Sequence, residues 1–242
     1  MRDAAFWFVL NPESQNGHTL FADSANNGPR GRALVEELIP ALEAKYKLIA
    51  SPSARLLRGH SSGGWSTLWL AVTYPETYGA TWSTSPDPVD FRRFQTPNIY
   101  SQANMFIGTD GSGTRGGVEL TSYRSGGRDL LTIRHENAME EVIGPDNTSG
   151  QQWDSWFAVY GPRNARGNPA AVYDVATTRI DRAVAERYRR FDATALLRAA
   201  PERYGPLFRD RVRLVVGGED SFYLNEAVEL LVRELQEKKV EL

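Results

Sequence analysis

The 242-residue sequence contains no cysteine, which excludes disulfide bridges and thiolate chemistry and leaves the cellular compartment open. It has no uninterrupted run of about 18 apolar residues, so nothing predicts a segment that spans a membrane. The 28 Lys and Arg residues nearly balance the 30 Asp and Glu residues. This balance argues against nucleic acid or an anionic membrane as a partner, because both are bound mainly by charge. The first residues also lack the basic, apolar and small-residue order of a signal peptide, and neither localisation nor oligomeric state follows from the sequence.

Signatures of metal and dinucleotide binding are weak as well. No spacing of histidines or carboxylates indicates a metal site, and Asp110 with Ser112 is too sparse for a calcium loop. Residues 111–116 fit the pattern G-x-G-x-x-G, but no helix is expected to begin behind them and no βαβ unit surrounds them. We therefore expect no metal and no other cofactor.

One stretch carries a stronger signal, Gly59-His60-Ser61-Ser62-Gly63-Gly64. Residues 54–58 before it are short and largely apolar, which predicts a strand, and residues 65–72 carry large apolar side chains at the spacing of a helix face. Between a strand and a helix, G-x-S-x-G acts as a nucleophile elbow, and Ser61 fits that register whereas Ser62 does not. The stretch therefore predicts Ser61 as a nucleophile and the backbone N–H of Ser62 as an oxyanion donor. The alternative is a glycine-rich turn that merely contains serines.

The remaining elements indicate an α/β fold. Amphipathic helices are expected over residues 32–46, where Pro40 should kink the helix or shift its start, and from Leu224 onwards. Strands that alternate with helices specify a parallel sheet with helices on both faces. A chain of 242 residues fits a single domain of this kind. Besides the strand before Ser61, we expect strands at three places, the first of them buried: 4–10, 79–86 and 212–216.

Residues 102–205 do not continue this pattern, since glycine, arginine and polar residues dominate there between a few aromatic ones. We interpret the segment as a cap-like insertion over the carboxyl end of the sheet, with a helix near 183–190. A second small domain and partial disorder are the alternatives.

Asp220 is the candidate for an acid that works with Ser61. It follows the last predicted strand, as Ser61 follows an earlier one, and ligands of such sheets collect at the carboxyl ends of the strands. A carboxylate there could orient a histidine that takes the serine proton. A turn or helix-capping role explains Asp220 equally simply. Glu219 is its competitor, and Asp87 is a weaker candidate for the same role.

The histidine of such a triad is missing where it is expected. In α/β-hydrolases the order is nucleophile, acid, histidine, and no histidine follows Asp220. Of the three that are present, His18 lies in a loop that could line the site. His60 adjoins the nucleophile and should point away from it, and His135 is most simply a surface residue.

With these residues, the sequence resembles the putative esterase family of the α/β-hydrolase superfamily, whose relatives include feruloyl esterases, the esterase D type and mycolyltransferases. The resemblance runs through most of the chain and implies an α/β-hydrolase fold, with Ser61 as nucleophile and Asp220 as triad acid. It is strongest in four segments: 21–29, 59–65, 83–91 and 217–224.

The same resemblance places Asn26, Asn27 and Trp65 near the site. Members of the family begin earlier, with strands and an oxyanion loop, and end later, with a strand that leads to the catalytic histidine. We therefore expect the chain to be an internal portion of such a hydrolase, incomplete at both termini and without that histidine, in which Met1 is an internal methionine.

The resemblance and the residues together predict a serine hydrolase that acts on small-molecule carboxylic esters through an acyl-enzyme on Ser61. An acyltransferase of the same fold is one alternative, and a non-catalytic fragment or binding protein that keeps the pocket is another. Because loss of a triad member costs several powers of ten in rate, we expect weak activity or none from the chain. The acyl and alcohol groups do not follow from the sequence.

Overall fold

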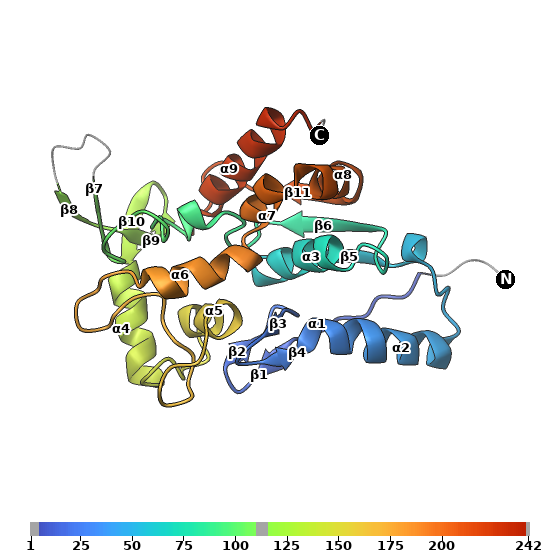
Figure 1. Cartoon of the computed structure of the whole chain (residues 1–242), viewed down its shortest axis with the longest axis horizontal. Coiled ribbons are helices and arrows are strands. Elements are labelled where there is room, and N and C mark those ends of the chain that lie inside the picture. The colour runs from blue at the N-terminus through green and yellow to red at the C-terminus, as the bar shows by residue number, and fades with distance from the viewer. Residues whose placement is uncertain (1–4, 110–115, 241–242) are drawn as a thin grey trace.

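The computed structural model describes residues 5–109 and 116–240. Ala4, Asp110 and most of the glycine-rich stretch 111–116 lie outside the described residues. In Figure 1, the two hairpins and the helix of residues 107–143 lie at the left, and the parallel sheet with its helices occupies the centre and right.

A sheet of three parallel strands carries the fold. The strands are β5 (Leu56–His60), β6 (Ala80–Thr84) and β11 (Val212–Val215), and β6 lies between the other two. Helix α3 (Ser62–Thr73) connects β5 to β6, which confirms the predicted alternation of strand and helix. The register pairs His60 with Thr84, so the chain leaves both strands at the same edge of the sheet.

The helices cover one face of this sheet. Helix α3 packs on β5 and β6, and α8 (Pro201–Arg211) packs on β6, β11 and α3. On the opposite face, Leu56, Trp82 and Val215 are 58%, 44% and 60% exposed. Within the described residues, the cover expected on both faces is therefore found on one face only.

The predicted strand at 4–10 is wrong for the part that the structure describes. Residues 5–10 form no strand, and Trp7 and Val9 are 78% and 96% exposed. The apolar run suggested burial, but a strand needs a neighbour to take its backbone hydrogen bonds. No described strand pairs with this segment, and the ring of Phe8 contacts only that of Tyr46 among the aromatic residues.

The helix predicted over 32–46 is confirmed, with an irregular middle. Its three parts are α1 (Arg30–Ala33), the π-helical turn η1 (Leu34–Leu38) and α2 (Ile39–Tyr46). Pro40 lies at the start of α2, directly after the π turn, where the normal hydrogen-bond ladder is already interrupted. Two short ladders, β1 (Glu13–Ser14) with β2 (Gly17–His18) and β3 (Asp23–Ser24) with β4 (Gly28–Pro29), shape the loop ahead of α1.

Residues 102–205 share their core with the sheet helices. The indole of Trp65 on α3 lies against the ring of Tyr160 on α5 (Gln152–Tyr160), with 5.4 Å between the ring centroids, and both side chains are fully buried. The helix predicted near 183–190 is present. The strands of this segment are β7 (Ile107–Thr109), β8 (Gly116–Glu119), β9 (Thr121–Ser125) and β10 (Arg128–Thr132). Its helices are α4 (Ile133–Ile143), α5 (Gln152–Tyr160), α6 (Arg182–Tyr188), the 3-10 turn η4 (Arg189–Phe191) and α7 (Ala193–Ala199). Two further 3-10 turns precede the segment, η2 (Pro52–Ala54) and η3 (Phe91–Arg93).

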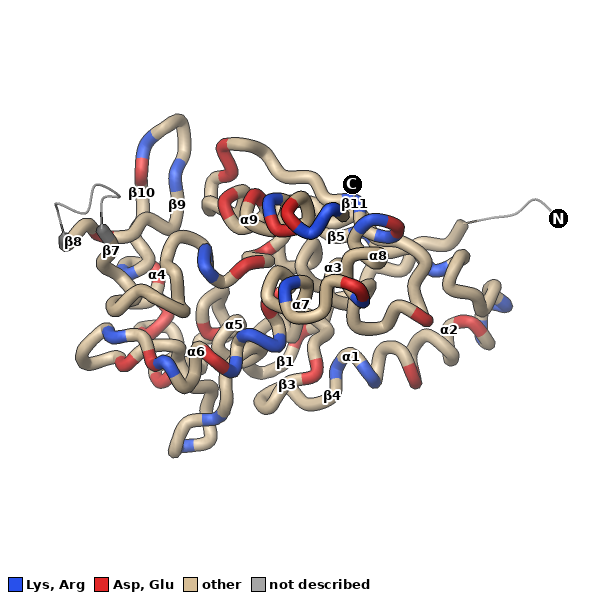
Figure 2. The backbone as a smooth tube through the Cα atoms, turned by 45° about the horizontal axis from the view of Figure 1, so that its top comes forward, with Lys and Arg blue, Asp and Glu red and all other residues tan. Residues whose placement is uncertain are grey.

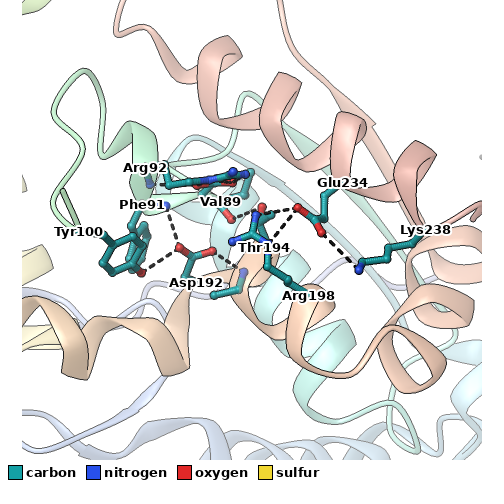
Figure 3. A network of polar contacts seen from close by, with 11 residues as sticks. Val89, Phe91, Arg92, Tyr100, Asp192, Thr194, Arg198, Glu234 and Lys238 are labelled. Atoms are coloured by element: carbon teal, nitrogen blue, oxygen red, sulfur yellow. Dashed lines mark hydrogen bonds and ion pairs between the residues drawn. The ribbon is translucent and has the colours of Figure 1, made fainter.

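A buried polar network ties the segment after β6 to the C-terminal helices (Figure 3). The carboxylate of Asp192 accepts hydrogen bonds from the backbone N–H of Phe91 (2.9 Å), the hydroxyl of Tyr100 (2.9 Å) and the backbone N–H of Ala195 (2.8 Å). Beside it, Arg198 of α7 forms an ion pair with Glu234 of α9 (Leu224–Glu237) at 2.6 Å. The network holds the segment that follows β6, through Phe91 and Tyr100, against the start of α7.

Charges are dispersed along the chain. Basic and acidic residues alternate along the backbone in Figure 2 without a large region of one sign. Among the helices of residues 5–109 and 116–240, none combines the length and the apolar character that a membrane crossing requires.

Candidate active site

Ser61 occupies a strained turn between β5 and α3. Its backbone has φ 56° and ψ −123°, a region that costs a residue with a side chain about 1–3 kcal/mol and persists only when the surroundings enforce it. The backbone N–H of Ser61 donates to the carbonyl of Thr84 (3.0 Å), and its carbonyl accepts from the N–H of Trp65 (3.0 Å). The end of β6 and the first turn of α3 therefore hold the serine in this conformation.

The three glycines of the stretch contribute unequally to the turn. A Cβ on Gly59 would lie 2.0 Å from the carbonyl oxygen of Gly63, and a Cβ on Gly64 would lie 2.7 Å from that of Thr84. A Cβ on Gly63 would meet nothing within 4 Å. Close approach of backbone to backbone therefore requires Gly59 and Gly64, whereas the second glycine of G-x-S-x-G is not required by space.

This difference predicts opposite results for two matched substitutions. We expect Gly59→Ala to lower the free energy of unfolding by about 3 kcal/mol or more, because the clash is with backbone that cannot move aside cheaply. Gly63→Ala should leave it unchanged or raise it by up to about 1 kcal/mol, since the added Cβ meets nothing and alanine is the better helix former. Urea unfolding of both variants checks this, and a larger loss for Gly63→Ala than for Gly59→Ala would contradict it.

Asp87 lies directly beside the two serines. It follows β6 and is 2% exposed. The hydroxyl of Ser61 donates to its Oδ1 at 3.3 Å, and the hydroxyl of Ser62 donates to its Oδ2 at 2.7 Å. From α5, the side-chain amide of Gln152 (3.2 Å) and the indole N–H of Trp156 (2.8 Å) donate to the same Oδ2. All four contacts are donations, the pattern that an ionised carboxylate accepts.

His18 is the nearest histidine. Its Nε2 lies 3.4 Å from the hydroxyl oxygen of Ser62, and its buried Nδ1 has no hydrogen-bond partner. Burial lowers the pKa of His18, and the nearby carboxylate of Asp87 offsets this only in part. The imidazole is thus neutral at neutral pH and can accept a proton. Its contact is with Ser62, and among the described residues no histidine is hydrogen-bonded to Ser61.

The first turn of α3 supplies backbone donors at the same place. The helix begins at Ser62, and the first N–H groups of a helix have no partner within it. They carry the positive end of the helix dipole, which favours an anion. The backbone N–H of Ser62, predicted as an oxyanion donor, therefore lies one residue from the Ser61 hydroxyl at a helix N-terminus.

A cavity of about 210 Å³ opens beside Ser61. Burial raises the pKa of Glu140 in its wall to about 7, against the opposing effect of the backbone N–H groups of Trp153 and Asp154 that donate to this carboxylate. The cavity lies between the turn before α3, helices α4 and α5 and the start of α9, at the carboxyl edge of the sheet. Its lining residues are Ser61, Asp87, Gln95, Glu136, Met139, Glu140, Gln151, Gln152, Trp156, Phe222 and Leu224.

The carboxylate of Asp220 is engaged in its own turn. It accepts from the backbone N–H groups of Phe222 (2.9 Å) and Leu224 (3.2 Å) at the start of α9. Phe222 and Leu224 line the cavity, so the segment that carries Asp220 reaches the site. No hydrogen bond joins Asp220 to a histidine, and its role as triad acid stays a prediction.

The other predicted site residues support the surrounding loops. Asn26 donates to the carbonyls of Ala158 (3.0 Å) and Gly161 (3.1 Å) at the end of α5. Asn27 accepts from Ser14 and Asn16 in the first loop, and Trp65 is fully buried and stacks on Trp69. None of the three predicted residues lines the cavity, and their predicted place near the substrate stays untested.

His60 and His135 lie as the sequence suggested. His60 is exposed at the end of β5, where the helices do not cover the sheet. His135 is exposed and caps α4 together with Thr132. Neither side chain is hydrogen-bonded to a serine of the site.

Sequence reasoning missed Gln152 and Trp156 and gave too little weight to Asp87. Gln152 and Trp156 are four residues apart on α5, so both side chains lie on one helix face. That spacing was the available signal, but nothing in the sequence indicated that the face meets Asp87. For Asp87 the signal was its place after β6. Because β6 and β5 are neighbouring parallel strands, Asp87 and Ser61 follow strand ends at the same edge of the sheet.

Comparison with known proteins identifies the family of the chain. A search of curated proteins finds no match. The model of the family described as putative esterase matches residues 7–240, nearly the whole chain. The chain belongs to this putative esterase family, which supports a hydrolase that acts on small-molecule esters.

Proposed function

We propose that the protein is a serine esterase in which Ser61 forms the acyl-enzyme. The observation that carries the proposal is the strained backbone of Ser61 at the junction of β5 and α3, with its side chain at the wall of the cavity. Strain of this kind persists where the surrounding structure enforces it, and it gathers at functional sites. The turn has the strand–serine–helix order of a nucleophile elbow.

In the proposed reaction, the oxygen of Ser61 attacks the ester carbonyl and its proton passes to a base. The resemblance assigns that base to a histidine assisted by Asp220, and the nearest histidine that the structure describes is His18, whose Nε2 lies 3.4 Å from the hydroxyl oxygen of Ser62. The negative charge that forms on the carbonyl oxygen is stabilised by the backbone N–H of Ser62 at the start of α3. The alcohol leaves with a proton, and water then releases the acyl group from Ser61.

Asp87 acts as a positioning residue in this proposal. Its Oδ1 holds the Ser61 hydroxyl, while its Oδ2 is held by Ser62, Gln152 and Trp156. Because Gln152 and Trp156 belong to the segment 102–205, we further propose that this segment is a cap whose helix α5 fixes one wall of the active site.

Trapping of the intermediate tests the proposal against a non-catalytic role. The protein is mixed with p-nitrophenyl acetate, quenched in acid and digested, and the peptides are analysed by mass spectrometry. We expect an acetyl group on the peptide that contains Ser61 and on no other serine. No acetylated Ser61 at any quench time, with folded protein, would contradict the proposal.

The same experiment separates a hydrolase from an acyltransferase. With added methanol or glycerol as acceptor, a hydrolase still releases mainly acetate, whereas an acyltransferase forms mainly the new acetate ester. We expect acetate to dominate.

A further inference from the structure

The cavity beside Ser61 contains acidic residues that nothing neutralises. Asp87, Glu136 and Glu140 line it, and no Lys, Arg or His is among its lining residues. None of the three carboxylates forms an ion pair with a described residue. His18, the nearest titratable base, is neutral at neutral pH because burial lowers its pKa. The cavity therefore has negative charge without a counterion from the protein.

Two of these acidic residues are neighbours on α4, and burial raises the pKa of Glu140 to about 7, so that it is only partly ionised at neutral pH. Glu136 and Glu140 are four residues apart, so they lie on the same helix face, where like charges are unfavourable. Both contact the start of α5: Glu136 accepts from the indole N–H of Trp153 (2.9 Å), and Glu140 accepts from its backbone N–H (3.0 Å). These neutral donors satisfy individual oxygens but leave the net charge unchanged.

A further acceptor in the wall has no partner. Gln95 is 3% exposed and lines the cavity, yet its Oε1 makes no hydrogen bond. A buried acceptor without a donor is unfavourable, and a ligand N–H group would remove this penalty. Aromatic rings complete the wall, since Trp156 is buried there and Phe222 lies half-exposed, and such rings attract cations over their faces.

We propose that this cavity binds a primary ammonium group, so that the substrate is an ester that carries an alkylammonium arm. The inference rests on the proposed function, because the ammonium group is taken to belong to the ester that Ser61 attacks. Glu136, together with the ionised form of Glu140, would supply the opposing charge, and Gln95 would accept one of the three N–H bonds. Anionic esters would be excluded by the same carboxylates.

Binding of three small probes of equal chain length tests this without requiring turnover. Pentylammonium, 1-pentanol and pentanoate are titrated into the protein, and the side-chain amide signals of Gln95 and Gln152 are followed by NMR. We expect pentylammonium to bind at least about tenfold more tightly than 1-pentanol and pentanoate to bind most weakly. Higher salt should reduce the advantage of pentylammonium.

A matched pair of variants locates the effect. Glu136→Gln keeps an acceptor for Trp153 but removes the charge, and it should abolish most of the preference for pentylammonium. Glu141→Gln removes a charge from the same helix at an exposed position outside the cavity and should leave the preference unchanged. Equal affinity of the native protein for pentylammonium and 1-pentanol, or tighter binding of pentanoate, would overturn the inference.

The outcomes for the two proposals can be distinguished. Acetylation of Ser61 without a preference for pentylammonium would support the esterase and overturn the ammonium site. A preference for pentylammonium that depends on Glu136, without acetylation of Ser61, would support the ammonium site in a protein that is not an esterase.

Discussion

Replacing Ser61 by alanine is expected to reduce ester hydrolysis, which should be weak in the native chain, to the rate in buffer alone, because the variant cannot form an acyl-enzyme. The expected effect is on kcat more than on KM, since the hydroxyl takes part in bond formation and contributes little to binding of the intact ester. Initial rates with a short p-nitrophenyl ester, corrected for hydrolysis in buffer, provide the measurement.

Ser62→Ala is the matched control for this substitution. Ser62 adjoins Ser61, has the same side chain and donates to the same carboxylate of Asp87. Its predicted contribution to the reaction is a backbone N–H, which alanine retains, so we expect a loss within about tenfold. Native rates in Ser61→Ala, or a larger loss in Ser62→Ala than in Ser61→Ala, would remove Ser61 from the reaction.

Asp192→Ala is expected to lower the free energy of unfolding by about 3 kcal/mol, because it leaves three buried or partly buried donors without an acceptor. Those donors are the N–H of Phe91, the hydroxyl of Tyr100 and the N–H of Ala195, drawn in part in Figure 3. Burial, with a further effect of the carboxylate of Asp90, raises the pKa of Asp192. Urea unfolding at a pH near 7 gives the comparison with the native protein.

Two milder variants show whether the network or the helix cap carries this stability. Asp181→Ala removes an exposed N-cap of α6, which accepts from the N–H groups of Ala183 and Val184, and should cost about 1 kcal/mol. Tyr100→Phe removes one donor of the network and should cost about 1 kcal/mol as well. Asp192 is the N-cap of α7. Equal losses in Asp181→Ala and Asp192→Ala would show that the contacts of Asp192 with Phe91 and Tyr100 add no stability beyond this capping.

Local patterns were sufficient to predict the elements around Ser61. The strands at β6 and β11, the helix that begins at Ser62 and the amphipathic α9 follow from periodicity, turn residues and the glycine spacing. The strand predicted at 4–10 failed because hydrophobicity alone does not supply a partner for backbone hydrogen bonds. The sheet face that carries Trp82 gives a second example. The sequence predicted helices on both faces of the sheet, but this face is exposed.

The polar contacts of the site depended on packing that no local pattern reveals. Gln152 and Trp156 reach Asp87 from 65 and 69 residues away in the sequence. Their contact depends on the packing of α5 against α4, β2 and β3 and on the ring contact of Tyr160 with Trp65. The acid predicted for the triad, Asp220, was chosen by its place after a strand, and in the structure its side chain satisfies the start of α9. Turn chemistry and catalytic chemistry use the same residue types at the same edge of a sheet.

The chemical identity of the group that reacts is tested most directly by labelling with a fluorophosphonate, followed by digestion and mass-spectrometric mapping of the phosphonylated residue. We predict a single phosphonyl group on Ser61, present in the native protein and in Ser62→Ala and absent from Ser61→Ala. Labelling at another residue, or equal labelling of the native protein and Ser61→Ala, would contradict the assignment of Ser61 as the nucleophile.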